Sequence, residues 1–312
     1  MTVKTSGDLL AMDVTGEACD LRAIGITKHY DSFTLDNVTL EVPRGYVVGL
    51  VGQNGAGKTT LMRAMLGIIR ADAGRIELFG EDVSAMGQRE LLAAKARVGF
   101  VSAVIGYPSA LTVAQVKTMY EMAYPAFDRA ACDALLTRLG LVGAEKKHVS
   151  ELSRGMGMKL QLACTLATSA DVLVLDEPTA GLDPIVRDEV LDVIREWMRD
   201  GDKSALISSH ITSDLEKIAD YVVMIEGGRV MLSLDRDGLE SYGVAHLRSS
   251  ELERVLADGF VAPGHAHVLD RHLERALLVP DRAAFKRAYP DYVCDPASID
   301  DVMTLLVRGE VR

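Results

Sequence analysis

Residues 52–59 carry glycines and polar side chains in the spacing that binds phosphate. They read Gly-Gln-Asn-Gly-Ala-Gly-Lys-Thr, which matches the pattern G-x-x-x-x-G-K-[ST], and a second threonine follows at 60. Glycines at 52, 55 and 57 let successive backbone N–H groups point at one anion, because no Cβ stands in the way. The ammonium of Lys58 can reach the outer phosphates, and the hydroxyl of Thr59 can ligate Mg²⁺. The segment therefore predicts a phosphate site that takes a magnesium ion.

Two adjacent acids follow a short apolar run later in the chain. Residues 171–176 read Asp-Val-Leu-Val-Leu-Asp, and Glu177 comes next. In a protein with a phosphate loop, an acid in the place of Asp176 orders the magnesium shell. Glu177 stands where the strand ends, so its carboxylate can turn toward an attacking water and accept a proton. The alternative for the isolated pair is two solvated acids at a strand end.

A second helix start and a histidine complete the candidate chemistry. Ser153 is a candidate N-cap before a long helix, and Gly155 permits close approach of the backbone, so this is a second anion-binding helix start. One nucleotide cannot easily use both starts in one chain, which suggests that two chains share it. His210 closes the apolar strand 204–209 and is a candidate sensor of the γ-phosphate. An ordinary capped helix and a structural histidine remain the alternatives.

The elements that position these residues alternate between strands and helices. An apolar run at 46–51 precedes the phosphate loop, as a buried parallel strand should, and 60–69 has apolar residues at helical spacing. Alternating residues over 20–42 predict antiparallel strands. Strands alternating with helices predict a parallel core whose ligands gather at the carboxyl edge. The remaining expected strands are 73–80, 98–101, 171–176, 204–209 and a 221–232 hairpin, and the expected helices are 87–97, 112–169 with breaks, 188–199, 212–219 and 298–308.

Composition limits the classes that the chain can belong to. At 312 residues, with 48% hydrophobic residues, one large α/β domain with a small appendage is expected. A net charge of −11 argues against a nucleic-acid surface as the main partner. The four cysteines form no C-x-x-C pair, so reduced thiols are expected rather than a zinc site or disulfides. No leader peptide and no membrane span are predicted, so a membrane would have to be supplied by a partner.

Taken together, these segments resemble the ATP-binding subunit of an ABC transporter over about residues 20–235. The family's motifs stand in order at 52–59, 152–156, 172–177, 180–184 and His210. The resemblance implies a P-loop NTPase of α/β class, the ABC cassette, with a mixed core sheet and an antiparallel β subdomain. It implies an ATPase domain at 21–237 with an inserted helical subdomain at about 104–169. Outside this match, the polar and unpatterned residues 1–20 are expected to be a mobile tail, and the weaker pattern of 238–312 predicts a small α/β extension.

The resemblance also assigns roles to particular residues. It implies that Tyr30 stacks on adenine, that Asp176 holds a magnesium-bound water, that Glu177 is the general base, and that His210 holds the γ-phosphate. Ser153 and Gly155 match residues that bind the ATP of the opposite subunit, and Asp183 matches a turn that contacts the other half of a dimer. The implied ATP and Mg²⁺ shell is Gly52, Gln53, Asn54, Gly55, Ala56, Gly57, Lys58, Thr59 and Thr60.

Three positions depart from the family pattern. The family usually has Leu-Ser-Gly-Gly-Gln at 152–156, whereas this chain has Arg154 in place of a glycine and Met156 in place of the glutamine. Ala103 stands where the family places a glutamine that helps to bind Mg²⁺ and lines the groove for the membrane subunit. Alanine has neither donor nor acceptor, so water would complete the metal shell and turnover is expected to be slow.

The resemblance implies an ATP-hydrolysing subunit that dimerises around two ATP molecules and drives transmembrane permease subunits. Its closest likeness is to bacterial exporters of the antibiotic-resistance and bacteriocin-immunity kind, at the cytoplasmic face of the membrane. The partner subunit is either a second copy or a paralogue, and no nucleic acid is expected. The alternatives are a soluble ABC-type ATPase acting on nucleic acid or ribosomes, and a weakly hydrolysing nucleotide-gated subunit. In the tail, His265, His267 and His272 are read as solvated rather than as metal ligands.

Overall fold

The computed structural model describes residues 18–262, 264–271 and 274–312. The chain divides into two compact units, one ending at Ser233 and one running from Leu234 to Arg312. The tail expected over 1–20 falls mostly on residues outside the described part. Of its last residues, Cys19 and Asp20 belong to the first strand, and Asp20 is buried, with its carboxylate accepting from Arg44 and from Ser204.

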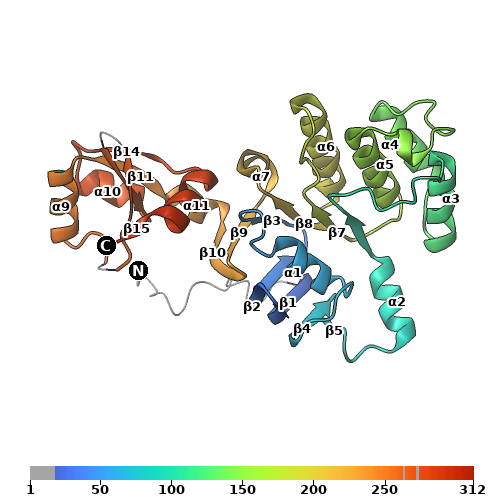
Figure 1. The fold of residues 1–312 in the computed structure, drawn as a ribbon, viewed down its shortest axis with the longest axis horizontal. Helices are drawn as coiled ribbons and strands as arrows, with labels where there is room; N and C mark the ends of the chain where they lie inside the picture. Colours follow the sequence, from blue (N-terminus) through green and yellow to red (C-terminus); the bar gives the residue numbers. More distant parts are fainter. Residues whose placement is uncertain (1–17, 263, 272–273) are drawn as a thin grey trace. The chain divides into compact units, whose positions relative to one another are not determined.

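The first unit begins with an antiparallel sheet in the strand order β2-β1-β4-β5 (Figure 1). Strand β1 is longer than the sequence suggests, because a register shift between Ala23 and Ile26 restores the buried face after Gly25, whose φ is +61°. Ala23 and Ile26, on either side of the bulge, are therefore both fully buried. The four strands are β1 Cys19–Tyr30, β2 Phe33–Pro43, β4 Ala73–Leu78 and β5 Glu81–Asp82.

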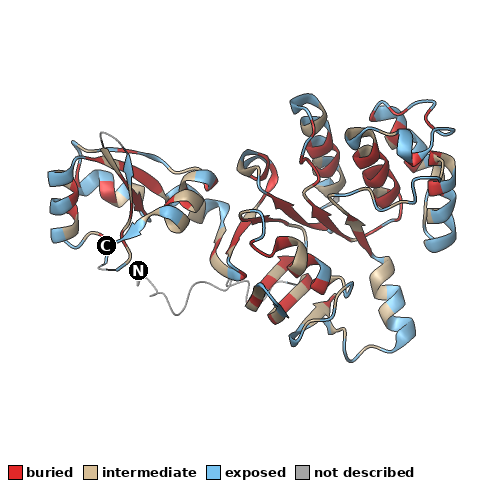
Figure 2. Cartoon of the chain, in the orientation of Figure 1, coloured by how far each residue is buried: buried red, intermediate tan, exposed pale blue. Residues whose placement is uncertain are grey.

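A six-stranded sheet in the order β10-β9-β3-β8-β7-β6 forms the centre of this unit. Strands β6, β7, β8, β3 and β9 pair in parallel, and Figure 2 shows β3, β7 and β8 as buried, as continuous apolar runs predict. The expected parallel core and its strands are thus confirmed. The bounds are β3 Val47–Val51, β6 Val98–Val101, β7 Val172–Asp176, β8 Ser204–Ser209, β9 Tyr221–Glu226 and β10 Arg229–Asp235.

Besides the helices within 112–169, four helices connect strands of the first unit in the described part of the chain. Helix α1 starts directly after the phosphate loop, and its buried residues Leu61, Met62 and Met65 join one core with Leu21 and Leu50. Helix α6 begins four residues before the expected start at 188, because the side chain of Asp183 caps it. The bounds are α1 Lys58–Met65, α2 Gln88–Ala96, α6 Pro184–Trp197, followed by the 3₁₀ turn η2 Met198–Asp200, and α7 Thr212–Ile218.

The expected helical stretch 112–169 consists of three helices, each with a side-chain cap. Thr112 accepts from the backbone of Gln115, Asp128 from that of Ala131, and Ser153 from that of Met156, so each helix start satisfies an otherwise unpaired N–H. The capping role predicted for Ser153 is therefore confirmed. The bounds are α3 Val113–Ala123, α4 Arg129–Arg138, the 3₁₀ turn η1 Val149–Glu151 and α5 Arg154–Leu166.

The second unit has its own core and a sheet that the sequence pattern did not reveal. Five antiparallel strands stand in the order β14-β11-β13-β12-β15, and one face packs Leu247, Leu277 and Val279 against Leu252 and Phe285 of two helices. A small α/β extension was expected here, but only its last helix was located in the sequence. The bounds are α8 Arg236–Ser241, β11 Gly243–Leu247, α9 Ser249–Ala257, β12 His267–Arg271, β13 Glu274–Val279, α10 Arg282–Ala288, β14 Val293–Pro296, α11 Ile299–Arg308 and β15 Glu310–Val311.

Candidate active site

The phosphate loop lies between β3 and α1, where its glycines are required for two different reasons. A Cβ on Gly52 would lie 2.2 Å from the carbonyl oxygen of Ile225, so the loop passes too close to β9 for any side chain. Gly55 and Gly57 have φ values of +86° and +112°, which L-residues rarely adopt. At Gly57 a Cβ would also lie 2.8 Å from Cζ of Phe33. The backbone geometry alone therefore gives a reason for each of the three glycines of the motif.

The ammonium of Lys58 is held at the centre of this loop. Its Nζ donates to the carbonyl oxygens of Gly52 at 2.7 Å and of Gln53 at 3.3 Å, and it lies 3.4 Å from Oε1 of Glu177. The side chain is only 6% exposed. A buried cation is costly unless it is paired, so this position favours an anion in the loop.

Asp176, at the end of β7, accepts hydrogen bonds from two hydroxyl groups. Thr59 Oγ1 donates to Oδ1 at 3.1 Å and Oδ2 at 2.9 Å, and Ser208 Oγ donates to Oδ1 at 2.8 Å. The carboxylate and the threonine hydroxyl are hard oxygen ligands of the kind that Mg²⁺ prefers. The donor set at the mouth of the loop therefore fits a magnesium ion, which Thr59 and Asp176 would hold directly or through water.

Glu177 turns away from the strand line and contacts His210. Its φ of +53° is left-handed, and its backbone N–H donates to the Oγ of Ser208 at 3.0 Å. Nδ1 of His210 lies 2.6 Å from Oε2 of Glu177, and the backbone N–H of His210 donates to the same oxygen at 3.3 Å. The predicted base and the predicted histidine thus meet at the carboxyl edge of β7 and β8.

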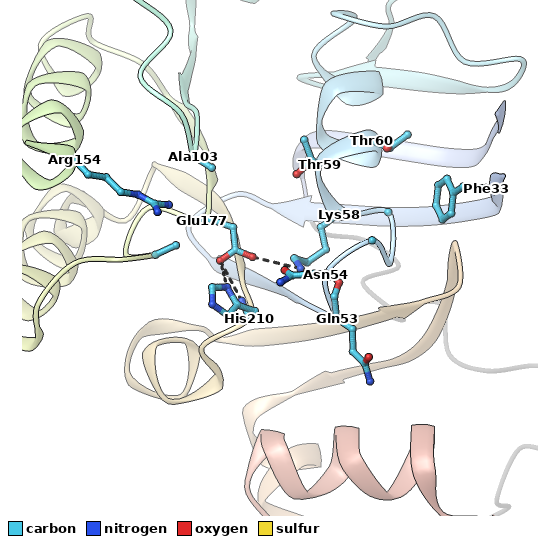
Figure 3. Close-up of a pocket in the computed structure, with 13 residues that line it drawn as sticks. Phe33, Gln53, Asn54, Lys58, Thr59, Thr60, Ala103, Arg154, Glu177 and His210 are labelled. Carbon is cyan, nitrogen blue, oxygen red and sulfur yellow. Dashed lines mark hydrogen bonds and ion pairs between the residues drawn. The ribbon is translucent and has the colours of Figure 1, made fainter. Parts of the chain in front are cut away.

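These side chains line an open cleft of about 480 Å³ (Figure 3). Most of the predicted phosphate shell borders it, but Gly52 and Ala56 are not among the described lining residues, and Ala56 is buried in the core. Tyr30 is not among the described residues that line it; the residue is 47% exposed, and its ring centroid lies 5.9 Å from Nζ of Lys28. The lining residues are Phe33, Gln53, Asn54, Gly55, Gly57, Lys58, Thr59, Thr60, Ala103, Arg154, Glu177, Ala180 and His210.

Sequence reasoning missed three of these residues, Phe33, Arg154 and Ala180, as members of the site. Phe33 pairs directly with Tyr30 across the β1–β2 ladder, so a hairpin at residues 30–33 would have identified it. Arg154 was noted only as a departure from the family pattern, because nothing local indicates where a side chain at a helix start will point.

Ser153, Gly155 and Asp183 lie outside the cleft lining as far as the described residues go. Ser153 is exposed at the start of α5, and a Cβ on Gly155 would meet nothing nearer than Leu182 Cδ2 at 3.5 Å, which is ordinary contact. The carboxylate of Asp183 accepts from the backbone N–H groups of Ile185 and Val186. The fold of one chain thus gives Asp183 a capping role and does not itself require a glycine at 155.

The described residues include no group of three or more His, Cys, Asp or Glu side chains that could hold a metal ion by themselves. His265 and His267 lie in the second unit, and His272 falls outside the described residues. In the same described part of the chain, no helix has the length and hydropathy needed to cross a membrane.

Comparison with known proteins identifies the family. The sequence model of the family described as "ABC transporter" matches residues 35–180. The chain is 37% identical over 221 residues to the daunorubicin resistance ATP-binding protein DrrA3 of Streptomyces coeruleorubidus, which covers 70% of this chain and 68% of that protein. It is 36% identical over 305 residues to the Nod factor export ATP-binding protein I of Paraburkholderia xenovorans, covering 92% and 96% of the two chains.

A solved structure described as the ATP-binding subunit of an ABC transporter has the same fold. Its TM-score is 0.63 at 23% identity, over 76% of this chain and 98% of that one. The predicted ABC cassette, with its mixed central sheet and antiparallel β subdomain, is thereby confirmed. The chain belongs to the ABC transporter family as an ATP-binding subunit, and it is an ABC-type ATPase.

Proposed function

We propose that this chain drives a membrane exporter by hydrolysing ATP, with Glu177 as general base. The observation that carries this proposal is the position of the Glu177 carboxylate, whose two oxygens contact Lys58 and His210 at the edge of the phosphate cleft. A carboxylate in this place can take a proton from a water as the water oxygen attacks the terminal phosphorus. The products are ADP and inorganic phosphate.

Each residue of the cleft has a distinct task in this proposal. Backbone N–H groups of 52–60 at the start of α1 bind the phosphates, and Lys58 neutralises their charge. Thr59 and Asp176 would hold Mg²⁺, which supplies charge stabilisation for the phosphates when bound. His210 orients Glu177 and contacts the terminal phosphate. Tyr30 supplies a face for adenine, and Phe33 borders the same cleft.

Two chains are proposed to close around two nucleotides. Ser153 and Gly155 are exposed or half-buried at the start of α5, and among the described residues they do not border their own cleft. An N-terminal helix end with free N–H groups and an uncrowded glycine suits an anion that another copy presents. The second chain is a further copy or a paralogue, with the turn at Asp183 facing it.

The membrane partner is proposed to dock beside the cleft. A groove of about 360 Å³ adjoins Ala103 and Arg154, and it carries Val104, which is 73% exposed. The nearby hydroxyl of Tyr107 is not free for such a partner, because it shares a hydrogen bond of 2.9 Å with the hydroxyl of Tyr120, and burial raises the pKa of Tyr107. The groove lining is Ala103, Val104, Ile105, Arg154, Met158 and Gln161.

Export is the direction that the relatives favour. Their names refer to daunorubicin resistance, bacitracin and lantibiotic transport, and Nod factor export, although one is a methionine import protein. We accordingly place the chain at the cytoplasmic face of a membrane, bound to permease subunits. We also retain the limits 21–237 for the ATPase domain, about 104–169 for its helical part and 238–312 for the extension.

The alanine at position 103 supports a second candidate function for the chain, that of a nucleotide-gated subunit that hydrolyses ATP only weakly. Its methyl group borders the cleft where a polar side chain could otherwise reach the nucleotide. ATP turnover measured with and without the permease distinguishes the two. A turnover that stays near zero in the complete transporter supports gating alone.

Replacing Lys58 tests the proposed function most directly. Lys58→Ala removes the buried ammonium from the loop and should abolish tight binding of both ATP and ADP, measured by calorimetric titration. Lys146→Ala is the matched control, because Lys146 is exposed in a loop far along the chain from the motif. Unchanged nucleotide affinity in Lys58→Ala would overturn the assignment of the phosphate loop.

A further inference from the structure

A buried acid, Asp214, lies beside a single cation without touching it. Asp214 stands in the first turn of α7 and is only 2% exposed (Figure 1). Nε of Arg187, in α6, lies 3.8 Å from Oδ2 of Asp214. Neither carboxylate oxygen of Asp214, nor Nε of Arg187, makes a hydrogen bond with any residue in the described part of the chain. A buried charge is costly unless it is paired and hydrogen-bonded, so the stability of the fold alone gives no reason for so loose a pair.

Arg187 connects this acid to the turn that follows Glu177. Its Nη2 donates a long hydrogen bond to the carbonyl oxygen of Leu182 at 3.5 Å, and its backbone N–H donates to the carbonyl oxygen of Asp183 at 3.0 Å. Asp183 caps α6 and belongs to the turn that is proposed to face the second chain. The guanidinium therefore contacts this turn on one side and lies close to α7 on the other.

Asp214 lies on the helix whose start holds His210. The backbone N–H of Asp214 donates to the carbonyl oxygen of Ile211 at 3.2 Å. Oγ of Ser209 accepts from the N–H of Ile211 at 2.9 Å and donates to its carbonyl oxygen at 3.2 Å. His210 is thus fixed between the end of β8 and the first turn of α7. Its ring and its backbone N–H both contact Oε2 of Glu177, so the position of α7 sets the position of the proposed base.

We propose that Arg187 is a positioning residue for ATP hydrolysis, which holds α7 so that His210 keeps Glu177 in place. Arg187 is not among the described residues that line the nucleotide cleft, so it acts through His210 rather than on ATP. Hydrogen-bonded groups of this kind lie about 2.9 Å apart, so a shift of about 1 Å completes the pair with Asp214. Closure of two chains on the turn beside Arg187 supplies that shift. This inference rests on the proposed function, since it requires Glu177 as the base.

Steady-state ATP hydrolysis by the full-length chain tests the inference. Arg187→Ala should lower kcat by about ten- to a hundredfold, as expected for a small misplacement of the reacting groups, while the Kd for ADP stays the same. Arg187→Lys should recover part of kcat, because its ammonium restores the charge. Lys217→Ala is the matched control and should change neither value. Lys217 pairs with Asp188 across the same two helices at 2.7 Å, but its side chain is 46% exposed.

Removing both charges separates positioning from stability. Arg187→Ala leaves a buried carboxylate unpaired, so its melting temperature should fall as well. Adding Asp214→Asn neutralises that carboxylate, so the double variant should regain most of the lost melting temperature while its kcat stays low. A kcat that recovers together with the melting temperature overturns the inference, because the pair would then serve stability alone.

A second pair of variants tests whether Arg187 acts through His210. Adding Arg187→Ala to His210→Ala should lower the single-turnover rate of ATP hydrolysis no further than His210→Ala alone does. Losses that multiply overturn the inference. Failure of the proposed function looks different, because Glu177→Gln would then hydrolyse ATP at the wild-type rate. If Glu177→Gln is slow while Arg187→Ala matches Lys217→Ala in kcat, the proposed function stands and only this inference fails.

Discussion

Nδ1 of His210 lies 2.6 Å from Oε2 of Glu177, while the opposite carboxylate oxygen lies 3.4 Å from Nζ of Lys58. The Glu177 carboxylate is thus held at one oxygen by His210 and at the other by the ammonium of Lys58. Glu177 adopts a left-handed φ of +53°, a conformation that costs a non-glycine residue on the order of 1–3 kcal/mol. The contacts to Lys58, Ser208 and His210 offset this strain, and they fix the carboxylate where the strand has ended.

Removing the charge of Glu177 should separate ATP binding from hydrolysis. Glu177→Gln keeps the shape of the side chain but cannot accept a proton, so kcat for ATP should fall by about 10²–10⁴ while ATP affinity is retained. Light scattering with ATP should then show a dimer that persists, because the terminal phosphate is not lost. Glu189→Gln, on the exposed side of α6, is the control. Hydrolysis at the wild-type rate would show that Glu177 is not the base.

A methyl group at Gly52 should disable the phosphate loop. The built Cβ lies 2.2 Å from the backbone oxygen of Ile225, which cannot rotate away, so the loop must shift and nucleotide affinity should fall about tenfold or more. Gly106→Ala is the matched control, because a Cβ there meets nothing within 4 Å and its φ is ordinary. Calorimetric titration with ADP measures both. Equal affinities in the two variants would contradict the argument.

The two aromatic residues of the β1–β2 hairpin should respond differently to truncation. Tyr30→Ala should weaken ATP and ADP alike by about tenfold, as expected for losing a stacked base, and leave the unfolding temperature unchanged because the ring is 47% exposed. Phe33→Ala should lower stability as well, since Phe33 packs against the core of the first unit. Retained affinity in Tyr30→Ala with a loss in Phe33→Ala would assign the stacking face to Phe33 instead.

The second unit should lose stability in mild acid because of His267. Burial is the main cause that lowers the pKa of His267 below its usual 6.5, and the charge on His265 lowers it further. Below about pH 6.5 the unfolded chain binds a proton that the folded chain resists. The free energy of unfolding therefore falls as the pH drops from about 6.5 toward the folded pKa, and this contribution is constant above about pH 6.5. Urea unfolding between pH 8 and pH 5 measures this slope. His267→Leu should have a smaller slope, and identical slopes would refute the prediction.

The sequence was sufficient for features set by local pattern. The spacing of 52–60 defines a loop whose glycines the structure requires individually, and buried apolar runs such as Val47–Val51 mark parallel strands without any tertiary knowledge. Asp176 and Glu177 could be placed because they follow such a run. Ser153 could be placed because a serine before a helix has one common use.

Features that depend on contacts between distant parts of the chain could not be predicted from local sequence patterns. The sheet of the second unit has strands of two to six residues, and its second face carries His246 between Glu274 and Asp295, so no clean alternation survives. The direction of Arg154 depends on the bare backbone of Gly181, which lies 27 residues later in the chain. Spacing along the sequence specifies neither the acids around His246 nor the glycine beside Arg154.

The presence of a separate core in each unit has a consequence for calorimetry of this chain. Heating need not produce a single cooperative transition, so one melting temperature does not describe the whole molecule. Nucleotide binds only the unit that carries residues 52–60, so by mass action it raises the midpoint of that transition alone. The part from Leu234 onward then serves as an internal reference, against which a drug-sized competitor of ATP can be told apart from a general stabiliser.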